Sequence, residues 1–312
     1  MFRIKLNNNL YLEEKTKIIA TIGNFDGVHE GHKKLLRQLD SKAKSFNAWR
    51  VVITFDVLPR EYFADKTNTL RLPRIGLLRD KIKVLKETNL VDEVVILHFN
   101  NHLAKLSPLE FIDNVLKDKL NVSNMLVGHD FRFGNKASGN INDLINAGID
   151  CEEFSEMRYD NVRISSSLIR ELASEQNLPI IKKYLGHNIS YTSRVVYGNQ
   201  IGRKYGVPTI NLELRKIRPV LWGIYVGFVY IDEHRYNGVV SIGKNPTVGE
   251  GNMYKVEAHL LDVDLNLYGK IASVEILHYL RPELKFTDLD TLFNQIHQDM
   301  QDARNFFAQI QE

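Results

Sequence analysis

The sequence predicts two successive folds: an α/β domain built on a mainly parallel sheet, then an antiparallel β domain that ends in a helix. Three observations lead to this prediction. The length of 312 residues suits about two domains of roughly 150 residues each. Strand-like and helix-like segments alternate in the first half, which is typical of βαβ units. After about residue 186, strand-like segments follow one another without helices, which is typical of an antiparallel barrel or sandwich.

The first half contains four apolar strand patterns with helical patterns between them. Strands are expected at 17–22, 51–55, 93–99 and 124–128, and helices at 29–45, at 75–87 and from Ser107 onward. The last of these helices has a clear start, because Ser107 can cap it, Pro108 suits its first turn and Glu110 completes a capping box. Parallel sheets of this kind bind ligands at the carboxyl ends of their strands.

The second half contains five strand patterns and a terminal amphipathic helix. The strands are expected at 190–196, 222–231, 235–243, 253–261 and 270–280. The helix is expected to open at Thr287 and to present one apolar face, made of Leu289, Leu292, Phe293, Ile296 and Met300. The domain boundary is expected between Gln176 and Asn188.

Composition narrows the class of protein. The chain is 44% hydrophobic and 25% charged, which argues against wholesale disorder and against a coiled coil. A net charge of +3 is too balanced to indicate nucleic-acid binding, although basic pockets for phosphorylated small molecules remain possible. The single cysteine, Cys151, permits neither an intramolecular disulfide nor a Cys-rich metal site. Without a secretory pattern or an apolar run of about 20 residues, we expect a cytoplasmic protein without a membrane partner.

Residues 23–32, GNFDGVHEGH, join the first strand to the first helix. Glycines in this turn let the backbone approach a ligand closely, and the N-terminus of the following helix favours an anion. His29 and His32 lie three residues apart, so they share a helix face and could stabilise charge at the α-phosphate of a nucleotide. The segment is neither a dinucleotide-binding fingerprint nor a P-loop. The alternatives are an ordinary glycine-containing turn and a metal-binding histidine pair.

The combination resembles the HxGH nucleotidyltransferase signature. Its G-x-F-D-G-x-H-x-G-H form is typical of the adenylyltransferase module of bacterial bifunctional riboflavin kinase/FMN adenylyltransferases. Residues 164–170, ISSSLIR, resemble the I-S-S-T-x-x-R element of that family, and residues 127–134, VGHDFRFG, resemble its VGxDFxFG segment. One segment departs from the family, because Val57 and Leu58 stand where a Pro-His pair is usual.

A second glycine-rich segment follows the first strand of the second half. Residues 198–212, GNQIGRKYGVPTINL, resemble the riboflavin kinase signature G-x-G-x-x-x-G-x-P-T-A-N-[LI], with Asn199-Gln200 and Ile210 as departures. Thr209 and Asn211 alternate to the same side of an extended segment, and their oxygens suit Mg²⁺ whose remaining ligands are ATP phosphates. The alternative for this segment is a long, solvated barrel loop.

Three more segments extend the resemblance, which covers about residues 15–305. Residues 238–247, GVVSIGKNPT, resemble the strand-plus-NPT element of the family. Residues 256–262, VEAHLLD, resemble a strand in which Glu257 would take the proton of the riboflavin 5′-hydroxyl. The alternative for Glu257 is a solvent-facing carboxylate. Residues 281–283, RPE, and the helix after them resemble the segment that closes on the flavin side.

The resemblance implies a Rossmann-like nucleotidyltransferase domain over 1–183 and a riboflavin kinase β-barrel over 184–312. The kinase would convert riboflavin and ATP to FMN, and the adenylyltransferase would convert FMN and ATP to FAD and pyrophosphate. Mg²⁺ would be required, and ATP would be the co-substrate of both reactions. The partners would be these small molecules, with neither nucleic acid nor membrane, and the chain would be a monomer or a weak homo-oligomer.

The resemblance also implies a role for each site residue. The catalytic group would be Glu257, His29, His32 and Arg170. The ATP and phosphate contacts would be Gly23, Phe25, Asp26, Gly27, Gly31, Ser165, Ser166, Gly202, Arg203, Gly206 and Pro208. The flavin contacts would be Asp130, Phe131, Arg281 and Glu283, and the metal ligands would be Thr209 and Asn211.

Three alternative functions remain at this point. The first is a single-activity kinase whose N-terminal domain is weakened by Val57 and Leu58. The second is a nucleic-acid-binding protein on the same folds, against which the balanced charge argues. The third is a non-catalytic flavin sensor, which would have no need of Glu257, Thr209 and Asn211.

Overall fold

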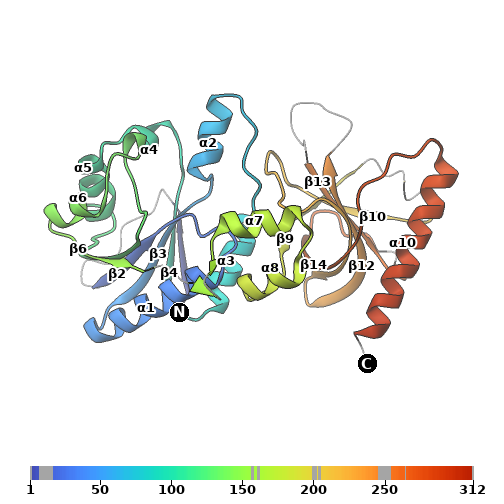
Figure 1. Cartoon of the computed structure of the whole chain (residues 1–312), viewed down its shortest axis with the longest axis horizontal. Coiled ribbons are helices and arrows are strands. Elements are labelled where there is room, and N and C mark those ends of the chain that lie inside the picture. The colour runs from blue at the N-terminus through green and yellow to red at the C-terminus, as the bar shows by residue number, and fades with distance from the viewer. Residues whose placement is uncertain are drawn as a thin grey trace. The chain divides into compact units, whose positions relative to one another are not determined.

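The computed structural model describes residues 2–6, 17–155, 158–159, 162–198, 202, 205–244, 254–263 and 265–310 (Figure 1). The chain divides into two compact units. The first comprises Met1–Leu72 and Lys81–Ser165, and the second comprises Pro73–Asp80 and Ser166–Glu312.

The first unit contains a six-stranded sheet in which every pair of neighbouring strands is parallel. The strand order is β1-β4-β3-β2-β5-β6. The strands are β1 (Arg3–Leu6), β2 (Ile18–Ile22), β3 (Trp49–Phe55), β4 (Glu93–Leu97), β5 (Asn124–Gly128) and β6 (Asp150–Phe154). This confirms the predicted parallel α/β fold and adds two strands that the sequence did not predict, β1 and β6. A short hairpin of β7 (Arg158–Tyr159) and β8 (Val162–Arg163) also belongs to this unit.

Helices connect these strands. They are α1 (Glu30–Phe46), α2 (Pro59–Lys66), α3 (Leu78–Glu87), α4 (Asn101–Lys105), α5 (Pro108–Phe111) and α6 (Ile141–Asn146). A π-helical turn, η1 (Ile112–Lys117), extends α5, and a 3₁₀ turn, η2 (Asn135–Ala137), follows β5. The predicted capping box is present, because the Glu110 amide donates to Ser107 Oγ over 3.2 Å and the Ser107 amide donates to Glu110 Oε2 over 2.8 Å.

Helix α3 begins at Leu78, so the predicted start at residue 75 is wrong. The apolar side chains of Ile75 and Leu77 continue the helical pattern in the sequence, but they are buried in the core of the second unit. Asp80 accepts a hydrogen bond from the Leu77 amide over 2.9 Å, which caps the helix at this point.

The second unit is a closed antiparallel barrel with the strand order β10-β13-β12-β11-β14-β9. Closure decides between the two predicted antiparallel architectures in favour of the barrel. The strands are β9 (Ser190–Val196), β10 (Thr209–Leu212), β11 (Gly223–Ile231), β12 (His234–Lys244), β13 (Tyr254–Leu260) and β14 (Ile271–Arg281). The helices are α7 (Ser166–Ser174), α8 (Leu178–Leu185) and α10 (Leu289–Gln309). The sequence predicted five of these strands and treated β10 as part of a loop.

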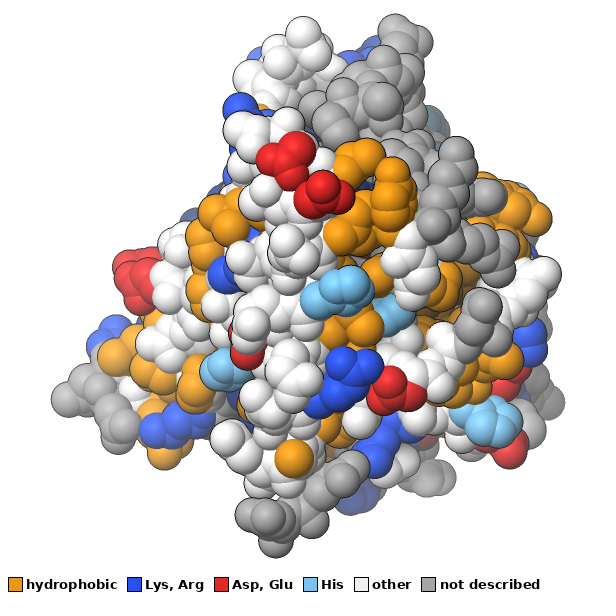
Figure 2. All heavy atoms as spheres, turned by 90° about the vertical axis from the view of Figure 1, so that its right-hand side faces the viewer, with side chains coloured by type: hydrophobic (Ala, Val, Ile, Leu, Met, Phe, Trp, Pro, Cys, Tyr) orange, Lys and Arg blue, Asp and Glu red, His pale blue; other side chains and the backbone are white. Residues whose placement is uncertain are grey.

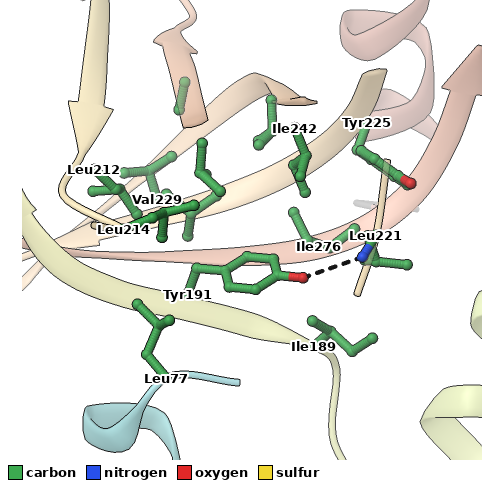
Figure 3. Packing of buried hydrophobic residues seen from close by; sticks show 14 of the residues in the cluster. Leu77, Ile189, Tyr191, Leu212, Leu214, Leu221, Tyr225, Val229, Ile242 and Ile276 are labelled. Atoms are coloured by element: carbon green, nitrogen blue, oxygen red, sulfur yellow. Dashed lines mark hydrogen bonds between the residues drawn. The ribbon is translucent and has the colours of Figure 1, made fainter. Parts of the chain in front are cut away.

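The barrel interior is the core of the second unit (Figure 3). Tyr191 and Tyr225 are fully buried there. The Tyr191 hydroxyl accepts a hydrogen bond from the Leu221 amide over 3.4 Å, so this polar group is satisfied inside an apolar core. Leu77, from the segment before α3, belongs to the same cluster and lies beside the strand that carries Tyr191.

A buried carboxylate holds this segment against the barrel. Asp80 is 4% exposed, and its oxygens accept hydrogen bonds from the Ser190 hydroxyl and the Thr192 amide of β9, each over 3.1 Å. Burial raises the pKa of the Asp80 carboxyl group. Helices α7 and α8 also contribute buried side chains to the barrel core. The domain boundary after residue 183 stays a prediction.

Helix α10 begins at Leu289, two residues after its predicted start, because Asp288 is its N-cap and accepts from the Thr291 amide over 2.8 Å. Phe293, Ala303 and Phe307 are buried, whereas Leu289 is exposed. Figure 2 shows a face on which charged side chains of both signs lie among hydrophobic ones. None of the helices that the structure describes is both long and apolar enough to span a membrane.

Candidate active sites

The turn after β2 has a strained backbone. Phe25, Gly27 and Val28 have positive φ angles of 46°, 79° and 42°. For Val28, a β-branched residue, this conformation is a genuine outlier. Phe25, Asp26 and Val28 are buried, so the surrounding structure holds the strain in place. Strain of this kind gathers at functional sites, which fits the predicted phosphate-binding role of the turn.

The predicted histidine pair comes together at the N-terminus of α1. The rings of His29 and His32 stack with 3.7 Å between centroids and 18° between planes. His29 is the N-cap, and its Nδ1 accepts from the His32 amide over 3.3 Å. A Cβ atom at Gly31 would lie 3.0 Å from His29 Nδ1 and 3.1 Å from the Ile164 carbonyl oxygen. Glycine at this position therefore lets α1 approach both the imidazole and the segment that leads to Ser165.

His32 is held in its neutral form. Burial, followed by the charges of His29 and Lys81, holds its pKa well below the ordinary value. Its Nδ1 is buried and has no hydrogen-bond partner among the described residues. A buried polar atom without a partner is rare in native proteins, so this nitrogen points to a ligand.

This burial makes stability depend on pH. Because the folded pKa of His32 is lowered, the unfolded chain binds the proton more readily, and the free energy of unfolding falls as pH drops below about 6.5. The slope reaches at most about 1.4 kcal/mol per pH unit for one proton. Urea unfolding between pH 5 and pH 8 checks this against His32→Gln, which lacks the titrating group. Equal pH dependence in the two proteins would contradict the prediction.

Lys81 contributes to this site, and the sequence did not predict it. Its ammonium group donates to Thr54 Oγ1 over 3.0 Å and to the Phe55 carbonyl over 3.2 Å, and Lys81 is only 5% exposed. Thr54 in turn donates to the Asn24 carbonyl of the phosphate turn over 3.2 Å. In the sequence Lys81 is one of several lysines in a helical pattern, so only the fold distinguishes it.

The segment with the unusual Val57-Leu58 pair starts a helix. Leu58 is 4% exposed and is the N-cap of α2. The carboxylate of Asp56, at the end of β3, pairs with the imidazole of His98 after β4, with 2.6 Å between Oδ2 and Nδ1. An imidazole is therefore present beside Asp56, although it comes from a different strand than in the family pattern.

The remaining predicted residues of this half have other contacts. Asp130 pairs with Arg163 at 3.1 Å, and both side chains are exposed. The Phe131 ring stacks on Phe133 with 5.4 Å between centroids. Arg170 lies in α7 and donates from Nε to the Pro73 carbonyl over 2.7 Å. Ser165 ends the first unit and Ser166 opens α7 in the second.

The barrel brings its predicted site residues together as cross-strand pairs. In the β10–β13 register, Thr209 lies opposite His259 and Asn211 lies opposite Glu257. The residues between them in both strands, such as Ile210 and Ala258, are buried in the barrel core. Because side chains alternate along a strand, Thr209, Asn211, Glu257 and His259 share the other face. Opposite residues in such a pair have Cβ atoms about 5 Å apart.

Charged neighbours surround Glu257. Lys255, two residues earlier on β13, donates to Glu257 Oε2 over 3.1 Å. Gly243 of β12 lies opposite Lys255, and a side chain there would overlap the Glu283 carboxyl group. Burial raises the pKa of Glu283, and the nearby charges of Lys255 and Glu257 also act on it. The structure thus brings Glu283 close to Glu257.

The glycine-rich loop before β10 is anchored at both ends. The amides of Tyr205 and Val207 donate to the Gly202 carbonyl over 3.0 and 2.9 Å, and a Cβ atom at Gly202 would overlap the Val207 carbonyl oxygen. At the other end, His259 Nδ1 lies 2.8 Å from the Pro208 carbonyl oxygen. Arg203 lies outside the described residues, as do 199–200, Lys204 and the predicted NPT motif at 245–247.

A pocket opens beside these residues. It is lined by Val195, Gly198, Pro208, Thr209, Ile210, Asn211, Leu260, Val263, Leu265, Leu267 and Tyr268. Thr209 and Asn211 provide polar groups and the leucines provide an apolar wall. Tyr268 stacks on Tyr197 with 3.9 Å between ring centroids. The pocket therefore combines polar groups with an apolar wall, as ligand sites commonly do.

Arg281 anchors helix α10. Its guanidinium donates to Asp299 over 2.7 and 2.6 Å in a two-pronged ion pair, and Asp299 is 3% exposed. Asp299 is another residue that the sequence did not predict, because it lies among the other polar residues of an amphipathic helix.

Removal of this carboxylate should destabilise the second unit. We expect Asp299→Ala to lower its free energy of unfolding by about 3 kcal/mol, because the substitution leaves the Arg281 charge poorly exposed and without its partner. Asp302→Ala, on the same helix but in an exposed pair with Gln298, is the matched control and should change stability by less than about 1 kcal/mol. Denaturant unfolding measures both. Equal effects would contradict the structural role of the pair.

Comparison with known protein families decides the class. The FAD synthetase family matches residues 12–168, and the riboflavin kinase family matches residues 185–307. This chain belongs to the bifunctional riboflavin kinase/FMN adenylyltransferase family. Its parallel α/β unit thus carries the FAD synthetase domain, and its barrel unit carries the riboflavin kinase domain.

Relatives match this family member over nearly their whole length. The bifunctional riboflavin kinase/FMN adenylyltransferase of Haemophilus influenzae is 39% identical over 92% of this chain and 93% of its own. The Escherichia coli K12 protein of the same name is 37% identical over 96% of each chain. A solved structure described as a macrolide-efflux protein from Streptococcus pneumoniae is 27% identical, with a TM-score of 0.75, over 97% of this chain and 99% of its own.

Proposed function

We propose that this member of the family carries out both flavin reactions with the residues that the two folds bring together. In the riboflavin kinase domain, Glu257 accepts the proton of the riboflavin 5′-hydroxyl as that oxygen attacks the γ-phosphorus of ATP and ADP leaves. The cross-strand pairing of Glu257 with Asn211 carries this proposal, because opposite residues have Cβ atoms about 5 Å apart and one of the two side chains suits the metal–phosphate complex.

Mg²⁺ fits the proposed kinase site through Thr209 and Asn211. A hydroxyl and an amide oxygen are hard ligands that Mg²⁺ accepts, with water and ATP phosphates as the other ligands. A side chain at Gly198 would overlap the Asn211 amide, so glycine keeps this group unobstructed. The bound ion would neutralise phosphate charge.

ATP binds the kinase domain, in this proposal, at the loop Gly202–Pro208 and in the adjoining pocket. Backbone amides of Gly202 and Gly206, together with the Arg203 side chain, contact the phosphates, and Pro208 lines the adjoining pocket. Arg281 and Glu283 lie on the flavin side. Because the Arg281 guanidinium already binds Asp299, Arg281 contributes to the flavin side indirectly, by holding the end of β14 against α10. Glu283, close to Glu257, lies where the ribityl chain would approach the base.

In the FAD synthetase domain, the FMN phosphate attacks the α-phosphorus of ATP and pyrophosphate leaves. His29 and His32 stabilise the negative charge that develops there, and neutral His32 donates a hydrogen bond. Backbone groups of Gly23, Phe25, Gly27 and Gly31 receive the phosphates at the N-terminus of α1, and Asp26 orders the turn. Ser165 binds the leaving pyrophosphate, whereas Asp130 and Phe131 contact the flavin. For Ser166 and Arg170, which belong to the second unit, the pyrophosphate role is what the family resemblance implies.

The remaining part of the proposal concerns the environment of the enzyme. We place it in the cytoplasm as a monomer or weak homo-oligomer whose partners are small molecules. The single Cys151, half-buried and with its pKa raised to about 11 by burial, is an unreactive thiol that suits a reducing compartment.

A time course of flavin products tests the proposal. Purified protein is incubated with riboflavin, ATP and Mg²⁺, and flavins are separated by HPLC. FMN that rises and then falls as FAD appears supports both activities and their order. No flavin product would overturn the functional proposal and leave the fold.

The same experiment tests the second candidate, a kinase with a weak adenylyltransferase. The observation that favours it is the buried Leu58 at the start of α2, where relatives usually have a histidine. FMN that accumulates without FAD would support this candidate. The FMN-plus-ATP reaction of His98→Ala then shows whether the imidazole beside Asp56 takes over a role in this domain.

A further inference from the structure

His259 lies on the face of β10 and β13 that also carries Thr209, Asn211 and Glu257. The proposed reaction gives it no task. It lies opposite Thr209 on the neighbouring strand and two residues from Glu257 on its own strand. It is 7% exposed, so it differs from a solvated strand histidine. Its Nδ1 lies 2.8 Å from the Pro208 carbonyl oxygen.

The geometry fixes which nitrogen carries the proton. A carbonyl oxygen only accepts hydrogen bonds, so Nδ1 of His259 must be the donor. Burial lowers the pKa of His259, so near neutral pH the ring is neutral and carries one N–H proton. The hydrogen bond to Pro208 places that proton on Nδ1. Protonation at lower pH would leave the Nδ1 donor in place.

The accepting residue is the last one before β10. Pro208 has no N–H group, so its carbonyl is the one backbone hydrogen-bonding group that can hold it. The loop before it is closed by hydrogen bonds from Tyr205 and Val207 to Gly202. Thr209 follows directly, and its oxygen is placed by the orientation of the Pro208–Thr209 peptide.

We propose that His259 is a positioning residue that holds the Pro208 carbonyl and thereby sets the nucleotide loop and Thr209 in their ATP-binding geometry. This inference rests on the proposed kinase function of the barrel. In this role His259 acts neither as an acid nor as a base. Its replacement should therefore weaken ATP binding and leave the rate of the chemical step unchanged.

Three substitutions in the full-length protein separate the donor from the bulk of the ring. In His259→Asn the side-chain amide nitrogen takes the place of Nδ1 and can still donate. In His259→Gln the amide nitrogen reaches the place of Nε2 instead, and His259→Ala removes the donor altogether. Steady-state riboflavin phosphorylation gives kcat and the KM values for MgATP and riboflavin.

We expect His259→Ala and His259→Gln to raise the KM for MgATP about tenfold, since a buried carbonyl loses its donor. The kcat and the KM for riboflavin should stay within about threefold of wild type, which also shows that the barrel is folded. His259→Asn should restore the KM for MgATP to within about threefold.

Other outcomes overturn the proposal. An unchanged KM for MgATP in His259→Ala would show that the bond does not set the loop. A fall in kcat alone would assign His259 to the chemical step. An equal rise of the KM for MgATP in the Asn and Gln variants would show a role in packing. So would a rise of both KM values together with a loss of cooperative unfolding of the barrel. If wild type forms no FMN, the kinase function has failed, and MgATP titration followed by tryptophan fluorescence, with the same three variants, still tests the loop.

Discussion

Glu257→Gln lowers the kcat of riboflavin phosphorylation about a thousandfold and leaves FMN adenylylation unchanged. Glutamine keeps the size of the side chain but cannot accept the hydroxyl proton, and a positioned general base contributes roughly 10²–10⁴ to a rate. The KM for MgATP should change little, because the ligands proposed for Mg²⁺ are on the opposite strand, β10. Separate assays with riboflavin and with FMN measure the two reactions.

Glu213→Gln is the matched control for this experiment. Glu213 follows β10 in the same unit, and its carboxylate forms an exposed pair with Arg215, so its replacement should leave both reactions within about twofold. If Glu257→Gln kept kinase turnover within a few-fold of wild type, another group would have to be the base.

His32→Ala lowers FMN adenylylation by roughly 10²–10³ and leaves riboflavin phosphorylation intact, because loss of one preorganised donor to a developing charge has an effect of that size. The substitution also removes the stacking partner of the His29 ring. The FMN-plus-ATP reaction gives the first rate and the riboflavin reaction gives the second.

His102→Ala serves as the control, since His102 is exposed in the same unit and lies outside the proposed site. It should preserve both rates. The opposite pattern for His32→Ala, with full adenylylation and no kinase activity, would reverse the assignment of the two reactions to the two domains.

Local sequence patterns were sufficient to predict the elements that are buried along their whole length. The strand β2, with the sequence IIATI, is buried at every position, so its apolar run is plain in the sequence. Strand β6, with the sequence DCEEF, has mostly exposed side chains and gave no such pattern. Strand β10 has four residues after a glycine-rich loop, which is too short for its alternation to stand out.

The same distinction applies to the sites. His29 and His32 lie in one short motif, and Glu257 lies in another, so local sequence was sufficient to propose them. Lys81, His98 and Asp299 depend on partners 18 to 42 positions away in sequence. A single sequence does not indicate such pairs, because only the fold brings the partners together.

Residues 73–80 belong to the second unit, although they lie within the sequence of the first. This has a practical consequence for any attempt to separate the two catalytic halves. Ile75 and Leu77 fill part of the barrel core, and Asp80 is bonded to β9. A fragment that starts at residue 184 would therefore open a gap in its own interior and leave the hydroxyl of Ser190 without its carboxylate. No single cut in the polypeptide separates a whole kinase from the first unit: an autonomous version would need this octapeptide grafted back through a linker or supplied as a separate peptide.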